Sequence, residues 1–146
     1  MDKNIIEYYT DKIKKHGPNS QGVDWNGKDS QYLRFDILSN IFKDKSNFSL
    51  LDYGCGYGEL LSYLHAKGYK NIKYMGFDLS NEMLNQASKK YKEGNFINKI
   101  PNNFKVDYAI LSGTLHIKLK ISESKWKNHI LNTLNHLNQI TDKGFS

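Results

Sequence analysis

The stretch LDYGCGYGE, residues 51–59, sets the interpretation of the whole sequence. An apolar run at 48–53 leads into three alternating glycines, Gly54, Gly56 and Gly58, and a helical pattern follows. Glycine adopts positive φ without a steric penalty and has no Cβ to keep a ligand away from the backbone. We therefore expect a strand, a tight bare turn and a helix at this point of the chain.

An acid stands at the end of the next expected strand. Asp78 lies 20 positions beyond Gly58 (78 minus 58) and closes the apolar run at 72–78. The carboxyl ends of neighbouring parallel strands lie side by side, so an acid there can accept hydrogen bonds from both hydroxyls of a ribose. Asp78 could instead cap the following helix, but Ser80 suits that role. We predict that Asp78 holds a ribose.

The glycine turn lacks the features of pyrophosphate sites. The dinucleotide pattern G-x-G-x-x-G/A needs a small residue where this chain has Glu59, which disfavours a nicotinamide-dependent oxidoreductase. No Gly-Lys-Ser/Thr of a phosphate-binding loop is present. Asp52 adds negative charge beside the turn, which repels phosphate and attracts an ammonium or sulfonium group.

Apolar spacing outside this turn predicts alternating strands and helices, hence a doubly wound α/β fold with a parallel sheet and helices on both faces. The predicted helices are 4–15, one capped by Asp29 or Ser30, 59–67, 81–92 and 123–141, and the strands are 48–53, 72–78, 95–97 and 106–111. The residues expected to face inward are Leu33, Ile37, Leu38 and Ile41, then Met83, Leu84 and Ala87, and finally Trp126, Ile130, Leu134, Leu137 and Ile140.

Three segments in order carry a family resemblance. LDYGCGYGEL (51–60), YMGFDLSNEML (74–84) and VDYAILSGTLH (106–116) resemble motifs I, II and IV of class I S-adenosylmethionine-dependent methyltransferases. The resemblance implies a Rossmann-like sheet of strand order 3-2-1-4, with the fifth strand starting at 144–146. It also implies one domain over 1–146, in which 1–47 form an N-terminal helical cap and 48–146 the cofactor-binding core. The C-terminal strands of the family would be missing from a truncated chain.

The resemblance further implies a set of residues that contact S-adenosylmethionine. The glycine turn would approach the methionine and ribose parts, an acid would lie near the amino group, a second acid would take the ribose hydroxyls, an apolar residue would pack on the adenine, and the end of the fourth strand would line the methyl-transfer site. An amide stands where the family usually has an acid at the adenine edge. In the order of these roles the residues are Gly54, Cys55 and Gly56, then Asp52, Asp78 and Leu79, then Leu111 and Ser112, and Asn98.

Arg34 is the sole arginine of the chain. A guanidinium matches a carboxylate in a bidentate manner, and some methyltransferases that this sequence resembles place an arginine in the preceding helix against the cofactor's carboxylate. We expect that role for Arg34, with Gln31 as a second candidate. The alternative for Arg34 is a surface position on the helix.

The catalytic residues and the acceptor are less well defined. His116 is the candidate general base, because histidine is the residue type most often used as a base near neutral pH; the alternative is a loop histidine at the rim of the cleft. Ser112–Leu115 replace the Asn/Asp-Pro-Pro-Tyr/Phe motif of the family's adenine and glutamine methyltransferases. We expect a small-molecule acceptor, bordered by Tyr8, Tyr9 and Trp25 unless these are plain core residues.

Two other functions stay open. One is a truncated or inactive domain that binds S-adenosylmethionine or S-adenosylhomocysteine without turnover. The other is a nucleic-acid methyltransferase, which is not favoured because 20 of the 21 basic residues are scattered lysines. A homodimer that covers an exposed sheet edge is a further expectation.

Composition bounds the remaining classes. The 146 residues are 38% hydrophobic and 13% aromatic, which suffices for one packed domain. No apolar run approaches the length of a membrane span, and the N-terminus lacks the apolar region of a secretory signal. Cys55, the single cysteine, excludes disulfides and multi-cysteine zinc sites, so we expect a cytoplasmic protein without a metal.

Overall fold

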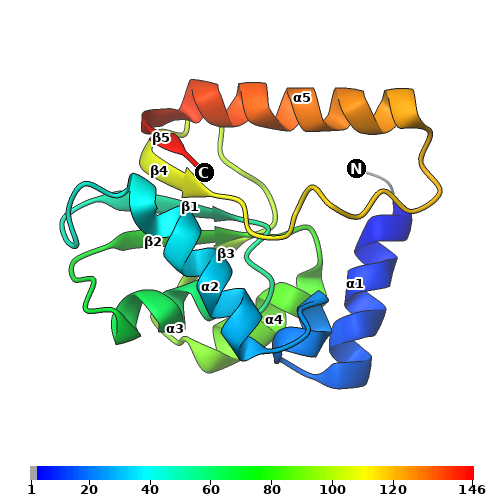
Figure 1. Cartoon of the computed structure of the whole chain (residues 1–146), viewed down its shortest axis with the longest axis horizontal. Helices are drawn as coiled ribbons and strands as arrows, with labels where there is room; N and C mark the ends of the chain where they lie inside the picture. The colour runs from blue at the N-terminus through cyan, green and yellow to red at the C-terminus, as the bar shows by residue number, and fades with distance from the viewer. Residues whose placement is uncertain (1–2) are drawn as a thin grey trace.

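The computed structural model describes residues 3–146. Its centre is a five-stranded parallel sheet of order β3-β2-β1-β4-β5, which confirms the predicted doubly wound fold and strand order (Figure 1). The strands are β1 (Ser49–Tyr53), β2 (Lys73–Phe77), β3 (Asn95–Ile97), β4 (Val106–Ile110) and β5 (Thr141–Phe145). The helices are α1 (Lys3–His16), α2 (Lys28–Leu38), α3 (Glu59–Ala66), α4 (Asn81–Lys90) and α5 (Glu123–Ile140), with short 3₁₀ turns η1 (Ser20–Val23) and η2 (Ser39–Ile41).

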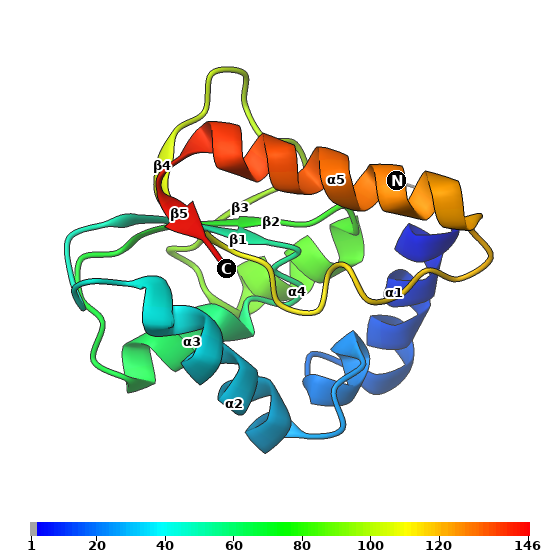
Figure 2. The ribbon, with the colours of Figure 1, turned by 45° about the horizontal axis from the view of Figure 1, so that its top comes forward.

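Helices cover both faces of the sheet. Figure 2 shows α2, α3 and α4 on one face and α5 on the other, while α1 and η1 stand beside the carboxyl ends of the strands. On the first face Leu50 and Ile110 pack against Leu60 and Leu64 of α3. On the second face Leu51 and its neighbours pack against Leu137 and Ile140 of α5. The two apolar layers therefore fix the positions of the strand ends relative to the helices on both faces.

The register places the functional turn at one edge. Tyr53 pairs with Phe77, so β1 and β2 end side by side, and the turn after β1 meets the segment after β2. Asp52 pairs with Ile110 on the other side, which brings the end of β4 to the same level. Three of the sequence motifs thus converge at the carboxyl ends of three adjacent strands.

The inner face predicted for the second helix is wrong at Leu33 and Ile37 and confirmed at Leu38 and Ile41, which are half-buried and pack against the core of the first face. Leu33 is 62% exposed and Ile37 is 54% exposed, whereas Phe35 and Gln31 are buried. The expected caps are also wrong, because Gly27 precedes the first turn and Asp29 and Ser30 lie within it. The aromatic ring of Phe35 buries more area than a leucine and packs on Tyr63, with 5.4 Å between ring centroids, so aromatic contacts decide the rotation of the helix.

The other helices match their predictions more closely. Met83, Leu84 and Ala87 of α4 are buried, and the Ser80 hydroxyl accepts from the Met83 N–H, which confirms Ser80 as the cap. In α5 Leu137 and Ile140 are buried, while Trp126, Ile130 and Leu134 are half-buried.

β5 differs from the expectation at its start. The strand begins at Thr141, directly after α5, instead of at 144, and its register with β4 shifts between Val106 and Tyr108. Within residues 3–146, none of the helices has the length and hydropathy needed to cross a membrane.

Candidate functional site

The turn after β1 requires glycine. Gly54 has φ of 80°, Gly56 of 53° and Gly58 of 83°, in the region that side chains rarely adopt. A Cβ on Gly54 would lie 2.5 Å from Thr114 Oγ1, and one on Gly56 would lie 3.0 Å from Val23 Cγ1. The Gly54 N–H donates to the Phe77 carbonyl at 2.7 Å, so the turn is tied to the end of β2.

Asp78 faces this turn. Its Oδ2 accepts from the Gly56 N–H at 2.9 Å and its Oδ1 accepts from the Ser80 N–H at 2.8 Å. Burial raises the pKa of the Asp78 carboxyl, and the N–H donors of Ser80 and Gly56 oppose that rise. A carboxylate oxygen has two lone pairs, so each oxygen can still accept a hydroxyl from a ligand.

A cavity opens between the glycine turn, the end of β4 and the α1–η1 segment. It contains about 820 Å³ of empty space, including the part that opens to solvent. Three carboxylates line it, those of Asp52, Glu59 and Asp78, and the lining taken from residues 3–146 holds no lysine, arginine or histidine. Such a wall favours a ligand that carries positive charge.

Asp52 is the most deeply buried acid of this cavity. It is 3% exposed, and its Oδ2 accepts from the Tyr74 hydroxyl at 2.6 Å. Burial raises the pKa of Asp52 to about 7; the Tyr74 hydrogen bond lowers it, and the charge of Asp78 adds to the rise. A cation placed beside Asp52 would stabilise its ionised form.

The predicted contact residues divide into two groups. Asp52, Gly54, Cys55, Gly56, Asp78, Leu79 and Ser112 line the cavity together. Burial raises the pKa of the Cys55 thiol, with the charges of Asp52 and Asp78 adding to the rise, so this side chain fills space as a neutral thiol. The hydroxyl of Ser112 is buried and has no hydrogen-bond partner within residues 3–146.

Four predicted residues lie outside the cavity lining. Arg34 is exposed on α2, and His116 is exposed on the segment after β4. Asn98 is exposed and donates to Asn81 Oδ1 at 3.2 Å. Leu111 is half-buried, and its N–H donates to the Ser146 carbonyl at 2.8 Å. The structure therefore does not bring these four side chains to the glycine turn.

A family model described as "Methyltransferase domain" matches residues 44–141, which include the glycine turn, Asp78 and the end of β4. The chain belongs to this methyltransferase domain family. This chain is 39% identical to "Putative methyltransferase Rv1506c" of Mycobacterium tuberculosis over 102 aligned residues. The alignment covers 68% of this chain and 61% of the relative. The methyltransferase domain thus spans about 61% of that relative's length.

Solved structures share the fold of this methyltransferase domain. A methyltransferase from Thiobacillus denitrificans, in complex with S-adenosylhomocysteine, has a TM-score of 0.57 at 20% identity, covering 97% of this chain and 53% of that one. The PH0226 protein of Pyrococcus horikoshii has a TM-score of 0.61 at 21% identity, covering 95% of this chain and 63% of that one. The agreement extends over nearly all of the methyltransferase domain.

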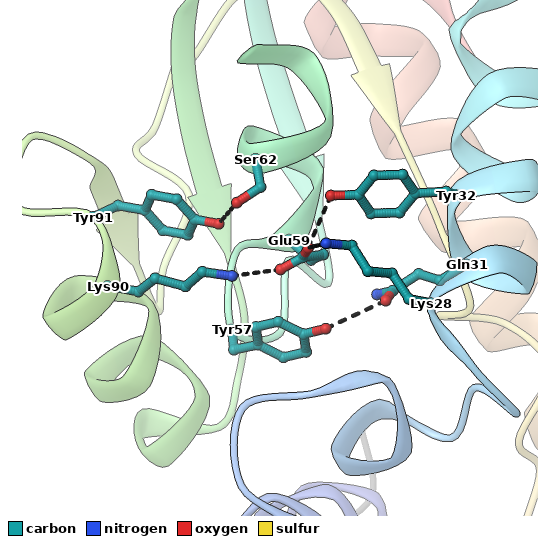
Figure 3. Close-up of polar contacts among 8 residues, drawn as sticks. All are labelled: Lys28, Gln31, Tyr32, Tyr57, Glu59, Ser62, Lys90 and Tyr91. Atoms are coloured by element: carbon teal, nitrogen blue, oxygen red, sulfur yellow. Dashed lines mark hydrogen bonds and ion pairs between the residues drawn. The ribbon is translucent and has the colours of Figure 1, made fainter. Parts of the chain in front are cut away.

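Sequence reasoning missed a polar cluster at the start of α3. Figure 3 shows the Glu59 carboxylate between α2 and α4: it accepts from the Tyr32 hydroxyl at 2.9 Å and pairs with Lys90 at 2.5 Å. Lys28 lies 3.8 Å from the same carboxylate. Burial raises the pKa of Tyr32 to about 12, with the hydrogen bond to Glu59 as the next cause. Glu59 therefore links α2 and α4 to the start of α3, directly after the glycine turn.

Gln31, the second candidate beside Arg34 in the sequence prediction, does lie at the cavity. It is 4% exposed, lines the cavity, and its Oε1 accepts from the Tyr57 hydroxyl at 3.2 Å (Figure 3). The sequence prediction favoured Arg34 because of its charge. The burial of the uncharged Gln31 could not be inferred from apolar spacing along the helix.

Proposed function

We propose that this methyltransferase domain binds S-adenosylmethionine and transfers its methyl group to a small-molecule acceptor. The observation that carries the proposal is the side-chain-free turn at Gly54 and Gly56, which faces Asp78 in a cavity lined by carboxylates and no basic residue. An adenosyl sulfonium compound fits this wall, since it combines a ribose diol with positive charge and has no phosphate.

The residues around the turn divide the work of binding. Asp78 accepts the ribose hydroxyls with the lone pairs that its backbone contacts leave free. Asp52 lies toward the ammonium group, and Gly54, Cys55 and Gly56 let the ligand approach the backbone. Bound S-adenosylmethionine supplies an electrophilic methyl group on its sulfonium, and the protein's task is to align that group and exclude water.

The remaining assignments are part of the same proposal. Leu79 packs on the adenine, and Asn98 contacts the adenine edge if its bond to Asn81 opens. Leu111 and Ser112 belong to the methyl-transfer end, and His116 is a base at the rim. Gln31 offers its amide N–H groups to the methionine carboxylate, because its carbonyl oxygen is already bound by Tyr57.

Similar proteins support the choice of ligand. The Thiobacillus denitrificans methyltransferase and the mycolic acid cyclopropane synthase CmaA1, which aligns with a TM-score of 0.61 at 14% identity over 83% of this chain and 42% of its own, were both crystallised with S-adenosylhomocysteine. We therefore choose that compound as the first probe.

Calorimetry with S-adenosylhomocysteine tests the proposal, with NAD as the competing ligand. We expect saturable binding of S-adenosylhomocysteine and none of NAD, and Asp78→Ala should weaken binding by about 1–3 kcal/mol. Asp78→Asn, which keeps one acceptor oxygen, serves as the second variant if the alanine form unfolds. Binding of NAD alone would overturn the proposal, whereas tight binding without methyl transfer to any acceptor would identify a binding domain without turnover.

We also propose a cytoplasmic location and a homodimer in which a second copy covers the open edge of β5. The lone buried thiol of Cys55 supports the first. β5 pairs only with β4, which supports the second. Light scattering at several protein concentrations gives the mass, and a monomer at every concentration contradicts the dimer.

A further inference from the structure

One end of the cavity is formed by aromatic rings and a free hydroxyl. Tyr9 of α1 and Trp25, after η1, line it together with Ser112 and Gly113. The Tyr9 hydroxyl lies 3.5 Å from the Gly113 carbonyl, and a Cβ built on Gly113 would lie 3.6 Å from Trp25 Cζ2. The Ser112 hydroxyl is buried and has no partner among residues 3–146, so a ligand atom that reached it would supply its missing hydrogen bond.

The charge around this space is negative. Glu59 is compensated by Lys90 at 2.5 Å, whereas no basic side chain within residues 3–146 forms an ion pair with Asp52 or Asp78. The proposed cofactor carries a sulfonium, an ammonium and a carboxylate, and so contributes one net positive charge. The loaded cavity then keeps an excess of one negative charge, which repels an anionic acceptor and attracts a cationic one.

The cavity wall contains no group suited to deprotonate an alcohol. Burial raises the pKa of Tyr9 far above its usual range, with the charge of Asp24 as the next cause, so Tyr9 keeps its proton. His116, proposed above as a base at the rim, is exposed and lies outside the lining, and its Cε1 would be 3.5 Å from a Cβ built on Gly113. Asp52 and Asp78 are taken up by the proposed cofactor contacts. A hydroxyl acceptor needs a base in contact with it during the transfer, whereas a bound ammonium can lose its proton to water or to His116 before the transfer and then presents a lone pair.

We propose that the acceptor of this methyltransferase domain is an amine on an aromatic or apolar skeleton, held between Tyr9, Trp25 and Ser112. The inference rests on the proposed methyl transfer. Ring contacts with Trp25 stabilise the positive charge that develops on nitrogen. The Ser112 hydroxyl accepts an N–H of the amine and thereby directs its lone pair.

The transfer balances without a further reactant. The bound ammonium first releases one proton to water or to His116, which frees the nitrogen lone pair. That lone pair forms the new N–C bond as the C–S bond breaks, and the electron pair of the broken bond goes to sulfur, which becomes a neutral thioether. The nitrogen becomes cationic and, in a primary or secondary amine, releases one proton to water. Positive charge thus moves from sulfur to nitrogen within the same negative surroundings.

Two probes that share a phenylethyl group and carry opposite charges test the inference. Calorimetry measures the binding of phenethylamine and of 3-phenylpropionate to the chain saturated with S-adenosylhomocysteine. This compound lacks the sulfonium and is neutral overall, so its complex keeps both negative charges of Asp52 and Asp78. We expect the amine to bind about tenfold or more tightly than the acid, which corresponds to about 1.4 kcal/mol. Equal affinities, tighter binding of the acid, or binding of neither probe to the loaded chain would overturn the inference.

The two tryptophans of the chain provide a matched control. Trp25→Leu should weaken phenethylamine binding by about fivefold or more, whereas Trp126→Leu, at a half-buried site of α5 outside the cavity, should leave it unchanged. Saturation with S-adenosylhomocysteine is measured first for each variant. A chain that does not bind S-adenosylhomocysteine refutes the proposed function, and a loaded chain with no preference for the amine refutes only the acceptor class.

Discussion

Two carboxyl groups meet at the carboxyl edge of the sheet, and Asp52 is the more deeply buried of them. Its hydrogen bond from Tyr74 replaces only part of the hydration lost on folding, and no cation within residues 3–146 forms an ion pair with it. An acid left in this state disfavours folding when ionised. Its retention at the cavity wall is understandable if a cationic ligand compensates it.

The elevated pKa of Asp52 gives a prediction for stability. The folded-state pKa of about 7 lies above the ordinary value of 3.8. The stability associated with its proton is therefore complete below the unfolded value and is lost as the pH rises through the folded one. Asparagine cannot ionise, so Asp52→Asn avoids the cost of a buried negative charge at high pH. We therefore expect the change that this substitution makes in the free energy of unfolding to be about 1–3 kcal/mol more stabilising near pH 8 than near pH 4. Urea unfolding at both pH values measures this difference, and an effect that does not vary with pH contradicts it.

Gln31 and Arg34 offer a prediction that separates two neighbours on α2. Gln31 is buried at the cavity, and Arg34 is exposed outside it. Gln31→Ala should weaken S-adenosylhomocysteine binding by about 1 kcal/mol, the usual size of one hydrogen bond, and leave 5′-methylthioadenosine, which lacks the carboxylate, unchanged. Arg34→Ala is the matched control, and calorimetry with both ligands measures the four affinities. A larger loss in the Arg34 variant would support the arginine predicted from the sequence and contradict the role of Gln31.

Residue patterns predicted the turn and Asp78 because both depend on local rules. Glycine spacing and the end of an apolar run are visible in the sequence. The burial of Gln31 and Glu59 depends instead on phenols from Tyr57 and Tyr32, which lie 26 and 27 residues away. Such pairings form only when the helices pack, so their residues could not be identified from spacing.

At the level of elements, α2 shows where apolar periodicity fails. Leu33 and Ile37 fit a helical stripe, yet both face solvent. Phe35 and Tyr32 pack on Tyr63 instead, with ring centroids 5.4 and 5.5 Å apart. The orientation of the helix follows its rings and phenol hydrogen bonds, a signal that the apolar count did not include. In the strands, by contrast, the short apolar runs are bounded by glycine or polar residues, and even β3, none of whose residues is fully buried, was predicted to the residue.

Glu59 gives a prediction for how α2, α3 and α4 are joined. Glu59→Gln keeps an acceptor for Tyr32 but removes the charge that pairs with Lys90, whose side chain is 38% exposed. Because Lys90 can turn to water, we expect a loss of about 1–3 kcal/mol, below the cost of a fully buried pair. Asp142→Asn is the control, since its pair with Lys105 is 3.8 Å long and exposed on both sides, and should change stability by less than about 0.5 kcal/mol. Urea unfolding compares the two variants, and equal losses would contradict a special role for Glu59.

At the scale of the whole molecule, the cavity lies between the core strands and the N-terminal segment that contains α1, and we expect these two parts to differ in local stability. We propose that residues 1–47 act as a cap on the core at 48–146. The core strands pack on two apolar layers. α1 packs through a smaller apolar cluster, in which its Ile13 joins Tyr57 and Met83, and through the contact of Thr10 with the Ser80 hydroxyl at 2.8 Å. Segments with few buried contacts open locally at a low free energy. We therefore expect the local stability of α1 to increase most when a ligand binds in the cavity.

Hydrogen exchange should detect that sensitivity. The cavity wall includes Ile5, Tyr9 and Trp25. S-adenosylhomocysteine bound in this cavity should therefore stabilise the packing of α1 and η1 against the strand ends. At a concentration 100 times its dissociation constant, S-adenosylhomocysteine adds about 2.7 kcal/mol, which corresponds to about 100-fold slower exchange wherever closure depends on the ligand. We expect this protection in residues 3–25 and little change in β5, which shares no residue with the cavity lining. Mass spectrometry of exchanged peptides measures both regions. Uniform protection would show that the molecule opens as a unit, because then α1 would be no less stable than the strands it covers.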